Sequence, residues 1–372
     1  MTDTPPAQQA PRETPLRAVH EALGANLVDF AGWLMPLRYG SETAEHTAVR
    51  ERAGLFDLSH MGEISVTGPQ AAALLDHALV GHMSAVREGR ARYTMICDAA
   101  GGVLDDLIVY RLGETEYLVV ANAANADVVH AALVERAAGF DATVTDRSAE
   151  FALIALQGPK AVEILAPHTD ATLDEIKYYA GYRQQVAGRP VMLARTGYTG
   201  EDGFEVFCAP ADAEHIWSAL LAAGEQHGLV PAGLSARDTL RLEAGMPLYG
   251  NELSREVTPF EAGLGRVVKF DKEGDFVGRD ALLARSKEGP RQRLVGLVAR
   301  GRRVPRHGYP VLVDGAPAGE VTSGAPSPTL GKPIAMAYVP ADAPPDAEYA
   351  VDVRGRAEPA DRVDLPFYQR AK

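Results

Sequence analysis

A short pattern of polar and apolar positions occurs twice in the chain. Residues 63–67 alternate between polar and apolar side chains, which is typical of a strand with one buried face. A Gly-Pro pair at 68–69 follows, and then apolar residues at helical spacing, with the proline suited to the first helical position. The same order returns about ninety residues later, with an apolar strand at 152–156 and a Gly-Pro pair at 158–159. This repeat predicts two related α+β halves.

The rest of the chain also alternates between the two kinds of element. Ser41 is a candidate N-cap of a short amphipathic helix that Gly54 ends. Further strands are predicted at 103–110, 117–121, 142–145, 191–195 and 204–208, and helices at 127–138 and 212–227. From about Ser286 the strands are short and separated by Gly and Pro, at 294–298, 319–323 and 334–339. The pattern predicts an antiparallel α+β fold that is followed by a small β-barrel.

Length and charge limit the classes of protein that fit. A chain of 372 residues exceeds what one hydrophobic core usually spans. We expect a disordered leader at 1–13, two α+β lobes within 14–285 and the barrel at 286–372. The 37 Lys and Arg against 50 Asp and Glu give a net charge of −13, which disfavours binding to nucleic acid. No run of eighteen apolar residues is present, so we expect no membrane association.

The sequence contains no motif that is typical of a disulfide-rich, metal-binding or nucleotide-binding protein. Cys97 and Cys208 lie far apart without CxxC spacing, which predicts neither a disulfide framework nor a metal site and fits a cytoplasmic location. Neither GxGxxG after a strand nor GxxxxGK[ST] occurs in a suitable context, so we expect no nucleotide.

Asp106 lies within a predicted strand that is apolar on both faces. Strand alternation places it on one face with Leu104, Ile108 and Tyr110. A buried carboxylate is costly unless a partner or a ligand satisfies it. A solvated turn that holds Asp105 and Asp106 explains the same residues equally well.

A second carboxylate follows a glycine-rich stretch. Residues 195–205 contain three glycines, which permit a close approach of the backbone to a ligand. Glu205 shares a strand face with Phe207, so its carboxylate points into an apolar setting. The stretch could also be a plain hairpin loop.

Arg237 stands near the start of a predicted helix. Ser235 and Asp238 fit the S-x-x-D capping box, which places Arg237 at the second helical position. The positive end of the helix dipole disfavours a cation there, so Arg237 needs a further partner. A surface ion pair with Asp238 or Glu243 is an equally good explanation.

Several polar aromatic and amide side chains could line a flat ligand, or serve the fold alone. They are Tyr93, Tyr110, Asn122 and Tyr198. His60 could act as a base, but no Ser or Cys nucleophile motif accompanies it, so we expect a structural role.

Seven segments of the sequence point to one protein family when they are considered together. They are 28–33 with 35–37, 56–63, 101–110, 122–125, 195–205, 236–238 with 241–243, and 322–324 with 327–331. In order over nearly the whole chain, from about residue 14 to the end, these segments resemble the aminomethyltransferases (T proteins) of the glycine cleavage system. The resemblance implies three lobes around a central folate pocket, with a β-barrel as the last lobe.

The resemblance also implies a reaction. A one-carbon unit passes from the aminomethyl-dihydrolipoyl arm of the H protein to tetrahydrofolate, giving 5,10-methylenetetrahydrofolate, ammonia and the dihydrolipoyl arm. Asp106 matches the catalytic aspartate of the family, where a carboxylate can orient the folate and stabilise developing positive charge. Glu205 and Arg237 match the folate-recognition pair, since a carboxylate accepts hydrogen bonds and a guanidinium donates them.

The resemblance also implies further residues that line the pocket, from their positions in the matching segments. They are Met61, Tyr93, Tyr110, Asn122 and Tyr198. Family members often add a residue from the extreme C-terminus. Here Tyr368 and Arg370 are the candidates, and we take Tyr368. The implied co-substrate is tetrahydrofolate and the implied partner is the lipoylated H protein, and we expect a monomer that uses neither a metal nor a nucleotide.

Three rivals share the implied scaffold, and fold alone does not decide activity. A sarcosine- or dimethylglycine-type dehydrogenase needs a separate flavin domain, for which the chain has no room. A tetrahydrofolate-dependent demethylase that acts on a sulfonium compound stays open as an alternative. A non-enzymatic folate-binding iron–sulfur assembly factor carries a Lys-Gly-Cys-type motif, and the comparable stretch 257–264 has no cysteine.

Overall fold

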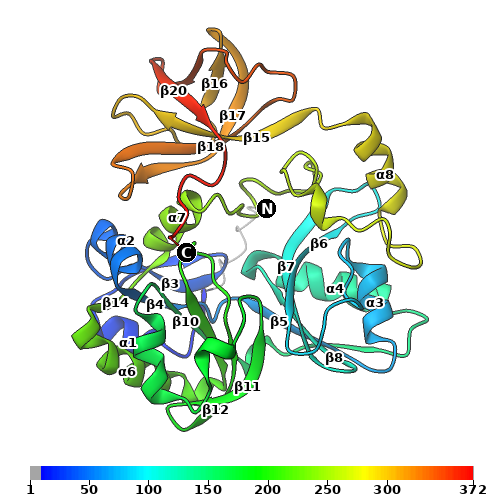
Figure 1. Cartoon of the computed structure of the whole chain (residues 1–372), viewed down its shortest axis with the longest axis vertical. Coiled ribbons are helices and arrows are strands. Elements are labelled where there is room, and N and C mark those ends of the chain that lie inside the picture. Colours follow the sequence, from blue (N-terminus) through cyan, green and yellow to red (C-terminus); the bar gives the residue numbers. More distant parts are fainter. Residues whose placement is uncertain (1–9, 372) are drawn as a thin grey trace, which may run out of the picture.

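The computed structural model describes residues 10–371, and its two largest open sheets follow the repeat in the sequence (Figure 1). The first sheet has the strand order β6-β7-β8-β5-β9 and the second β11-β12-β13-β10-β4-β14. The first comprises β5 (Gly62–Thr67), β6 (Ala91–Cys97), β7 (Val103–Gly113), β8 (Glu116–Ala121) and β9 (Thr143–Asp146). The second comprises β4 (Ala53–Asp57), β10 (Ala152–Gln157), β11 (Gly181–Val186), β12 (Arg189–Ala194), β13 (Gly203–Cys208) and β14 (Leu229–Pro231). Each copy of the repeat thus lies in a sheet of its own, and β4 is an additional strand in the second sheet.

The two Gly-Pro pairs make the same turn in both halves. Gly68 and Gly158 have φ angles of +123° and +131°, a region that side chains other than glycine rarely adopt. A Cβ on either glycine would also meet a backbone oxygen, of Asp141 at 2.7 Å or of Arg52 at 2.6 Å. Both helices begin two residues after the proline, so the proline precedes the first helical position that was predicted for it.

Helices cover the outer face of each sheet, and a further core lies between the sheets. The helices are α1 (Arg17–Ala22), α2 (Glu42–Glu51), α3 (Ala71–Ala78), α4 (Ala126–Arg136), α5 (Ala161–Leu165), α6 (Ala213–Gly224), α7 (Leu234–Glu243) and α8 (Arg279–Glu288). Between the sheets, Tyr110 and Leu118 of the first half pack with Phe56 and Phe207 of the second. The rings of Tyr110 and Phe207 lie 5.8 Å apart in an edge-on arrangement. The two lobes therefore share apolar surface and hold the space between them in a fixed shape.

The C-terminal part forms the predicted barrel, which is closed in the order β15-β18-β17-β16-β19-β20. Its strands are β15 (Gln292–Ala299), β16 (Pro310–Val313), β17 (Ala316–Ser327), β18 (Lys332–Pro340), β19 (Tyr349–Asp352) and β20 (Ala357–Val363). Closure leaves no strand edge unpaired. In Figure 1 the barrel lies above the two lobes, and α7 lies beneath it and contacts β17 and β18.

The N-terminal segment corrects two expectations. It forms a small sheet in the order β1-β3-β2, with β1 (Arg12–Glu13), β2 (Asn26–Phe30) and β3 (Trp33–Arg38). The expected disordered leader was therefore placed too far along, because 12–13 pair with β3; residues 1–9 lie outside the described residues. Ser41 caps α2 as predicted, but Gly54 does not end it, because the helix stops at Glu51 and Gly54 lies inside β4.

Glu243, the last residue of α7, ties the barrel to the second lobe. Its carboxylate accepts hydrogen bonds from Ser327 Oγ (2.5 Å) and Thr329 Oγ1 (2.7 Å) of the barrel. It also pairs with His46 and Arg50 of α2, at 3.1 and 2.8 Å. Burial opposes ionisation, yet the hydrogen bonds from His46, Ser327 and Thr329 lower the pKa of Glu243 to about 2.

Within residues 10–371, no helix combines the length and the apolar character that crossing a membrane requires.

Candidate active site

A cavity of about 330 Å³ lies between the two sheets. Eight of the nine residues predicted for the pocket line it: Met61, Tyr93, Asp106, Tyr110, Asn122, Tyr198, Glu205 and Arg237. The other lining residues are Leu58, Leu107, Ile108, Val120, Leu153, Tyr179, Thr196, Gly197, Gly245, Met246, Pro247 and Leu264. Side chains from both lobes and from α7 thus converge on one largely apolar space with few polar groups, as ligand sites usually do.

Asp106 projects from β7 into this cavity. The hydroxyl of Tyr93 donates to Asp106 Oδ2 at 3.1 Å, and the amide of Asn122 donates to Oδ1 at 2.9 Å. Burial raises the pKa of Asp106 to about 6, although these two hydrogen bonds oppose the rise. The carboxyl group therefore changes its charge close to neutral pH.

The strand around Asp106 departs from strict alternation at one position. Ile108 and Tyr110 share the cavity face with Asp106 as expected, but Leu104 packs into the core of the first lobe. The pairing of β6 with β7 shifts register at this point, with Ile96 opposite Asp105 and Cys97 opposite Val103. This irregularity reverses the face on which Leu104 lies.

The solvated-turn explanation of the Asp-Asp pair is wrong. The side chain of Asp105 is fully buried and accepts hydrogen bonds from Asn122 and Asn125. Asp106 is half-buried and lines the cavity. Asp105 thus lies in the interior of the first lobe, and Asp106 lies in the wall of the cavity.

Glu205 stands on β13, across the cavity from the first sheet, with Phe207 on the same strand in the core between the lobes. Thr196 Oγ1 donates a short hydrogen bond to Glu205 Oε2, and the hydroxyl of Tyr110 approaches the same oxygen at 3.4 Å. Burial raises the pKa of Glu205, while Thr196 and the charge of Arg237 oppose the rise. The segment 195–205 is thus a wall of the cavity rather than a plain hairpin loop.

Arg237 reaches the cavity from α7, although the predicted capping box does not form. The helix begins at Leu234 behind Gly233, without a side-chain cap, and Asp238 instead accepts from Arg241 at 2.7 Å. Arg237 is therefore the fourth helical residue, and its two suggested ion-pair partners are engaged by other residues. Its guanidinium makes no hydrogen bond within residues 10–371, and it lies 4.7 Å from the ring centroid of Tyr198. Burial lowers the pKa of Arg237, and Tyr198 and Glu205 counteract this.

Sequence reasoning did not single out Tyr179, Thr196, Met246 and Pro247. Thr196 precedes the first glycine of the 195–205 segment, and that position was the one available signal. Tyr179 has a φ angle of +59°, an unusual conformation that no local pattern announces. Met246 and Pro247 follow the end of α7 and reach the cavity only because the helix is docked on the second lobe.

Tyr368 and His60 lie outside the cavity lining. The ring of Tyr368 stacks on the guanidinium of Arg50 at 4.0 Å, and its backbone N–H donates to the carbonyl of Glu243, so it belongs to the contact between α7 and the C-terminal segment. His60 is buried against Phe30, with ring centroids 5.6 Å apart. Burial and the charge of Arg237 lower the pKa of His60 to about 4, which keeps the imidazole neutral.

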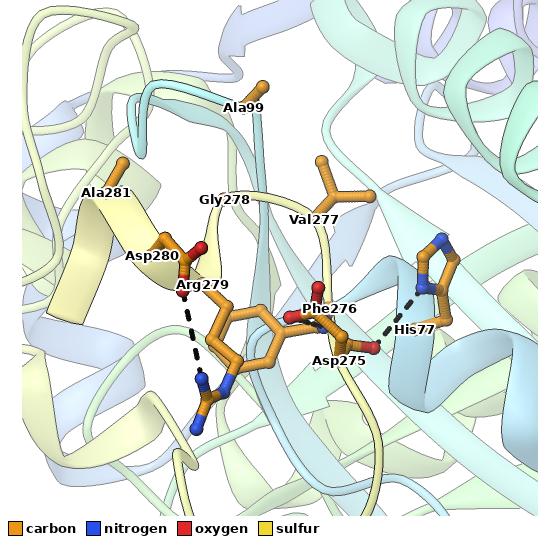
Figure 2. A pocket seen from close by; sticks show the side chains of 9 residues that line it. All are labelled: His77, Ala99, Asp275, Phe276, Val277, Gly278, Arg279, Asp280 and Ala281. Atoms are coloured by element: carbon orange, nitrogen blue, oxygen red, sulfur yellow. Dashed lines mark hydrogen bonds and ion pairs between the residues drawn. The ribbon is translucent and has the colours of Figure 1, made fainter.

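A second hollow, open to solvent, lies where the first lobe meets the start of α8 (Figure 2). His77 faces the backbone oxygen of Asp275 at 3.2 Å there, and Arg279 pairs loosely with Asp280 at 3.8 Å. None of the residues predicted for the pocket lines it. Across residues 10–371, no three His, Cys, Asp or Glu side chains form a group that could hold a metal ion.

Comparison with known proteins agrees with this geometry. The family description "GCVT N-terminal domain" matches residues 16–272, and "Glycine cleavage T-protein C-terminal barrel domain" matches 292–369. An aminomethyltransferase of Streptomyces coelicolor is 67% identical over 366 residues, which cover 97% of this chain and 98% of the relative. One from Streptomyces avermitilis is 66% identical over 371 residues, or 98% of this chain and 100% of the relative.

A solved structure extends the agreement to three dimensions. The glycine cleavage system aminomethyltransferase T from Bartonella henselae superposes with a TM-score of 0.90 at 37% identity, covering 96% of this chain and 98% of that one. The expected α+β architecture with a C-terminal barrel is confirmed. The chain therefore belongs to the family of glycine cleavage T proteins, which are aminomethyltransferases.

Proposed function

We propose that the central cavity binds tetrahydrofolate and that the chain transfers to it the one-carbon unit of an aminomethyl-lipoyl arm on the H protein. One observation carries the proposal. Arg237, a cation in the cavity wall without an internal hydrogen-bond acceptor, shares that cavity with the carboxyl group of Asp106. Relatives at 66–67% identity bear the name aminomethyltransferase, which favours this reaction over demethylation.

The residues of the cavity fit a pterin ring system. Tyr198 and Tyr179 offer aromatic walls to a flat ligand, and Leu153 and Val120 add apolar surface. Arg237 has N–H groups free to donate, and the carboxyl group of Glu205 can accept from ring and amino N–H groups. The volume of about 330 Å³ lies at the lower end of the range for ligand pockets.

The bonds that break and form in the transfer determine what Asp106 has to do. The transfer breaks the bonds from the carbon to the lipoyl sulfur and to the departing ammonia, and forms two bonds from that carbon to nitrogen. Tetrahydrofolate supplies the two nitrogen atoms, and their protons end on the sulfur and on the ammonia. Asp106, held by Tyr93 and Asn122, offers negative charge where positive charge develops. With its pKa near 6 it can also hold one of these protons in passing.

The lining groups come from one chain, so we propose that the protein acts as a monomer and meets the H protein only for the reaction. Both cysteines, Cys97 and Cys208, are buried and free, in keeping with a cytoplasmic location.

A coupled assay tests the proposal. Purified protein is mixed with aminomethyl-loaded lipoyl H protein and tetrahydrofolate, and ammonia and 5,10-methylenetetrahydrofolate are followed together. We expect both products in equal amounts, and only when tetrahydrofolate is present. Binding of tetrahydrofolate without release of either product would overturn the assignment of the donor, and methylated amines and sulfonium compounds would be tested next.

A further inference from the structure

Asp105 lies beside the proposed catalytic residue but does not line the cavity. Its side chain is fully buried, and its carboxylate accepts three hydrogen bonds. The donors are the backbone N–H of Asn122 (2.9 Å), the side-chain amide of Asn122 (2.9 Å) and the side-chain amide of Asn125 (2.8 Å). One carboxylate therefore anchors both the backbone and the side chain of Asn122.

Asn122 connects this buried carboxylate to the cavity. Its Nδ2 lies 2.9 Å from Asp105 Oδ1 and 2.9 Å from Asp106 Oδ1, with the backbone oxygen of Asp106 at 3.2 Å. All three neighbours are acceptors, so the amide must turn its NH₂ group toward the two aspartates. Within residues 10–371 the side-chain oxygen of Asn122 has no hydrogen-bond partner, and it remains available as an acceptor.

We infer that Asp105 is a positioning residue, which fixes the amide of Asn122 and through it the orientation of the Asp106 carboxylate. Only the expected kinetic effect of this inference depends on the proposed function. Without Asp105, the side chain of Asn122 keeps only its contact with Asp106 and can rotate about χ1 and χ2. The carboxylate of Asp106 would then have one fixed donor, Tyr93, and one donor that can rotate, Asn122. Because a small misplacement of a reacting group can cost up to about 100-fold in rate, we expect activity to fall about 10- to 100-fold.

Kinetics on the full-length chain supply the first test, with Asp105→Asn and the shorter Asp105→Ser as variants. We expect kcat to fall about 10- to 100-fold, with the KM for tetrahydrofolate changed by less than about threefold. Asp98→Asn is the matched control. Asp98 accepts from the backbone N–H groups of Ala100 and Gly102 at the turn before β7 and does not contact Asn122, so kcat should stay within about twofold of the parent.

A double variant separates positioning from an independent effect. If Asp105 acts through Asp106, then adding Asp105→Asn to Asp106→Asn costs no further activity, because the group being positioned is already gone. A further fall about as large as in the single variant, or an unchanged kcat in both Asp105 variants, overturns the inference.

A spectroscopic test does not depend on activity. The chain contains four asparagines, at 26, 122, 125 and 251, so selective ¹⁵N-asparagine labelling yields four side-chain amide signals. Asn122→Ser assigns the signal of Asn122, and Asn251, bonded to Ser323 at 2.9 Å, is the internal reference. In Asp105→Ser we expect hydrogen exchange of the Asn122 amide to accelerate about tenfold or more while Asn251 is unchanged. Unchanged exchange at Asn122 overturns the inference, whereas an inactive parent with an accelerated Asn122 amide in the variant overturns only the proposed function.

Discussion

The guanidinium of Arg237 lies 4.7 Å from the ring centroid of Tyr198, whose hydroxyl donates to the backbone oxygen of Pro247 at 2.6 Å. The ring is thus held at both ends, by its own loop and by the segment after α7. Because the ring covers one face of the guanidinium, the N–H groups along the edge of that plane remain free to donate. Arg237 is a preorganised donor, not a mobile surface charge.

Arg237→Ala should weaken the binding of tetrahydrofolate about 10- to 100-fold, since hydrogen bonds to a charged group contribute about 1.5–3 kcal/mol each. Arg237→Lys should recover only part of this loss, because an ammonium retains the charge without the planar set of donors. Isothermal titration with tetrahydrofolate measures both. Arg183→Ala, at an exposed ion pair with Glu116, is the control, and an unchanged dissociation constant in Arg237→Ala would contradict the assigned role.

Asp106→Asn should lower kcat by about 10²- to 10³-fold and leave the affinity for tetrahydrofolate within about threefold, since the shape of the side chain is retained and the charge is lost. In the parent protein, activity should rise with pH through about 6, where the raised pKa of Asp106 places its ionisation. A pH–rate profile measures this rise, which should disappear from the residual activity of the variant. Parent activity that stays flat between pH 5 and 7, or a fully active variant, would remove the Asp106 carboxylate from the reaction.

Glu63, on β5, is 1% exposed, and its Oε1 has no hydrogen-bond partner among the described residues. Burial raises the pKa of Glu63 well above its usual value of 4.5. The folded protein thus favours the neutral acid of Glu63, so the contribution of Glu63 to the free energy of unfolding is highest below pH 4.5 and falls as the pH rises toward the raised pKa. Glu63→Met should remove this contribution to the fall and raise the unfolding free energy at pH 8 by about 1–3 kcal/mol.

Urea denaturation of the parent and of Glu63→Met at pH 4.5 and pH 8 checks this expectation. Glu63→Gln, which cannot ionise but still buries a polar group, should lose the same pH dependence with a smaller gain. If the unfolding free energy of Glu63→Met fell with pH as steeply as that of the parent, the buried carboxyl would not be its source.

Glu243→Gln should loosen the contact between the barrel and the second lobe. The lowered pKa of Glu243 means that its ionised form stabilises the fold above pH 4.5, and this stabilisation is lost as the pH falls toward about 2. At pH 6 the variant should lose about 3 kcal/mol of unfolding free energy, because the buried guanidinium of Arg50 keeps only Glu201 as a carboxylate partner and His46 loses the carboxylate that it contacts. The deficit should narrow in acid, as urea denaturation at pH 6 and pH 3 would show. Glu150→Gln, in an exposed ion pair, should unfold like the parent at both values, and an equal deficit at pH 6 and pH 3 would argue against a role for the charge.

Local sequence signals predicted the helices, strands and turns well where neighbouring residues determine the backbone conformation. The Gly-Pro turns and the strand alternation are of this kind, since they depend on neighbours in sequence. The capping box at Ser235 and Asp238 failed because Arg241, one turn on, competes for the same carboxylate. Gly54 was taken as a helix end, but sheet pairing with Gln157 of β10 draws it into a strand. Both errors arise where a tertiary partner overrides a local preference.

The site was predictable only in part, for a similar reason. Burial of Asp106 and Glu205 follows from their apolar strand neighbours, and the resemblance to a family supplied their partner Arg237. Tyr179 and Pro247 reach the cavity through the packing of the second lobe and α7, which no stretch of sequence reveals. The opposite error occurs at Tyr368. Its position near the C-terminus suggested a pocket residue, but its ring stacks on Arg50 outside the cavity.

Four strands of each repeat follow in the same order, β6-β7-β8-β5 in the first sheet and β11-β12-β13-β10 in the second, which β4 then extends. Two identical halves would give the cavity two equivalent walls, and an asymmetric molecule could then bind in either of two orientations. The walls have diverged: Asp106 stands on the second strand of its sheet and Glu205 on the third strand of the other, beside the cation of α7. Because the two walls differ in this way, a ligand whose two ends differ meets matching groups in only one of the two orientations.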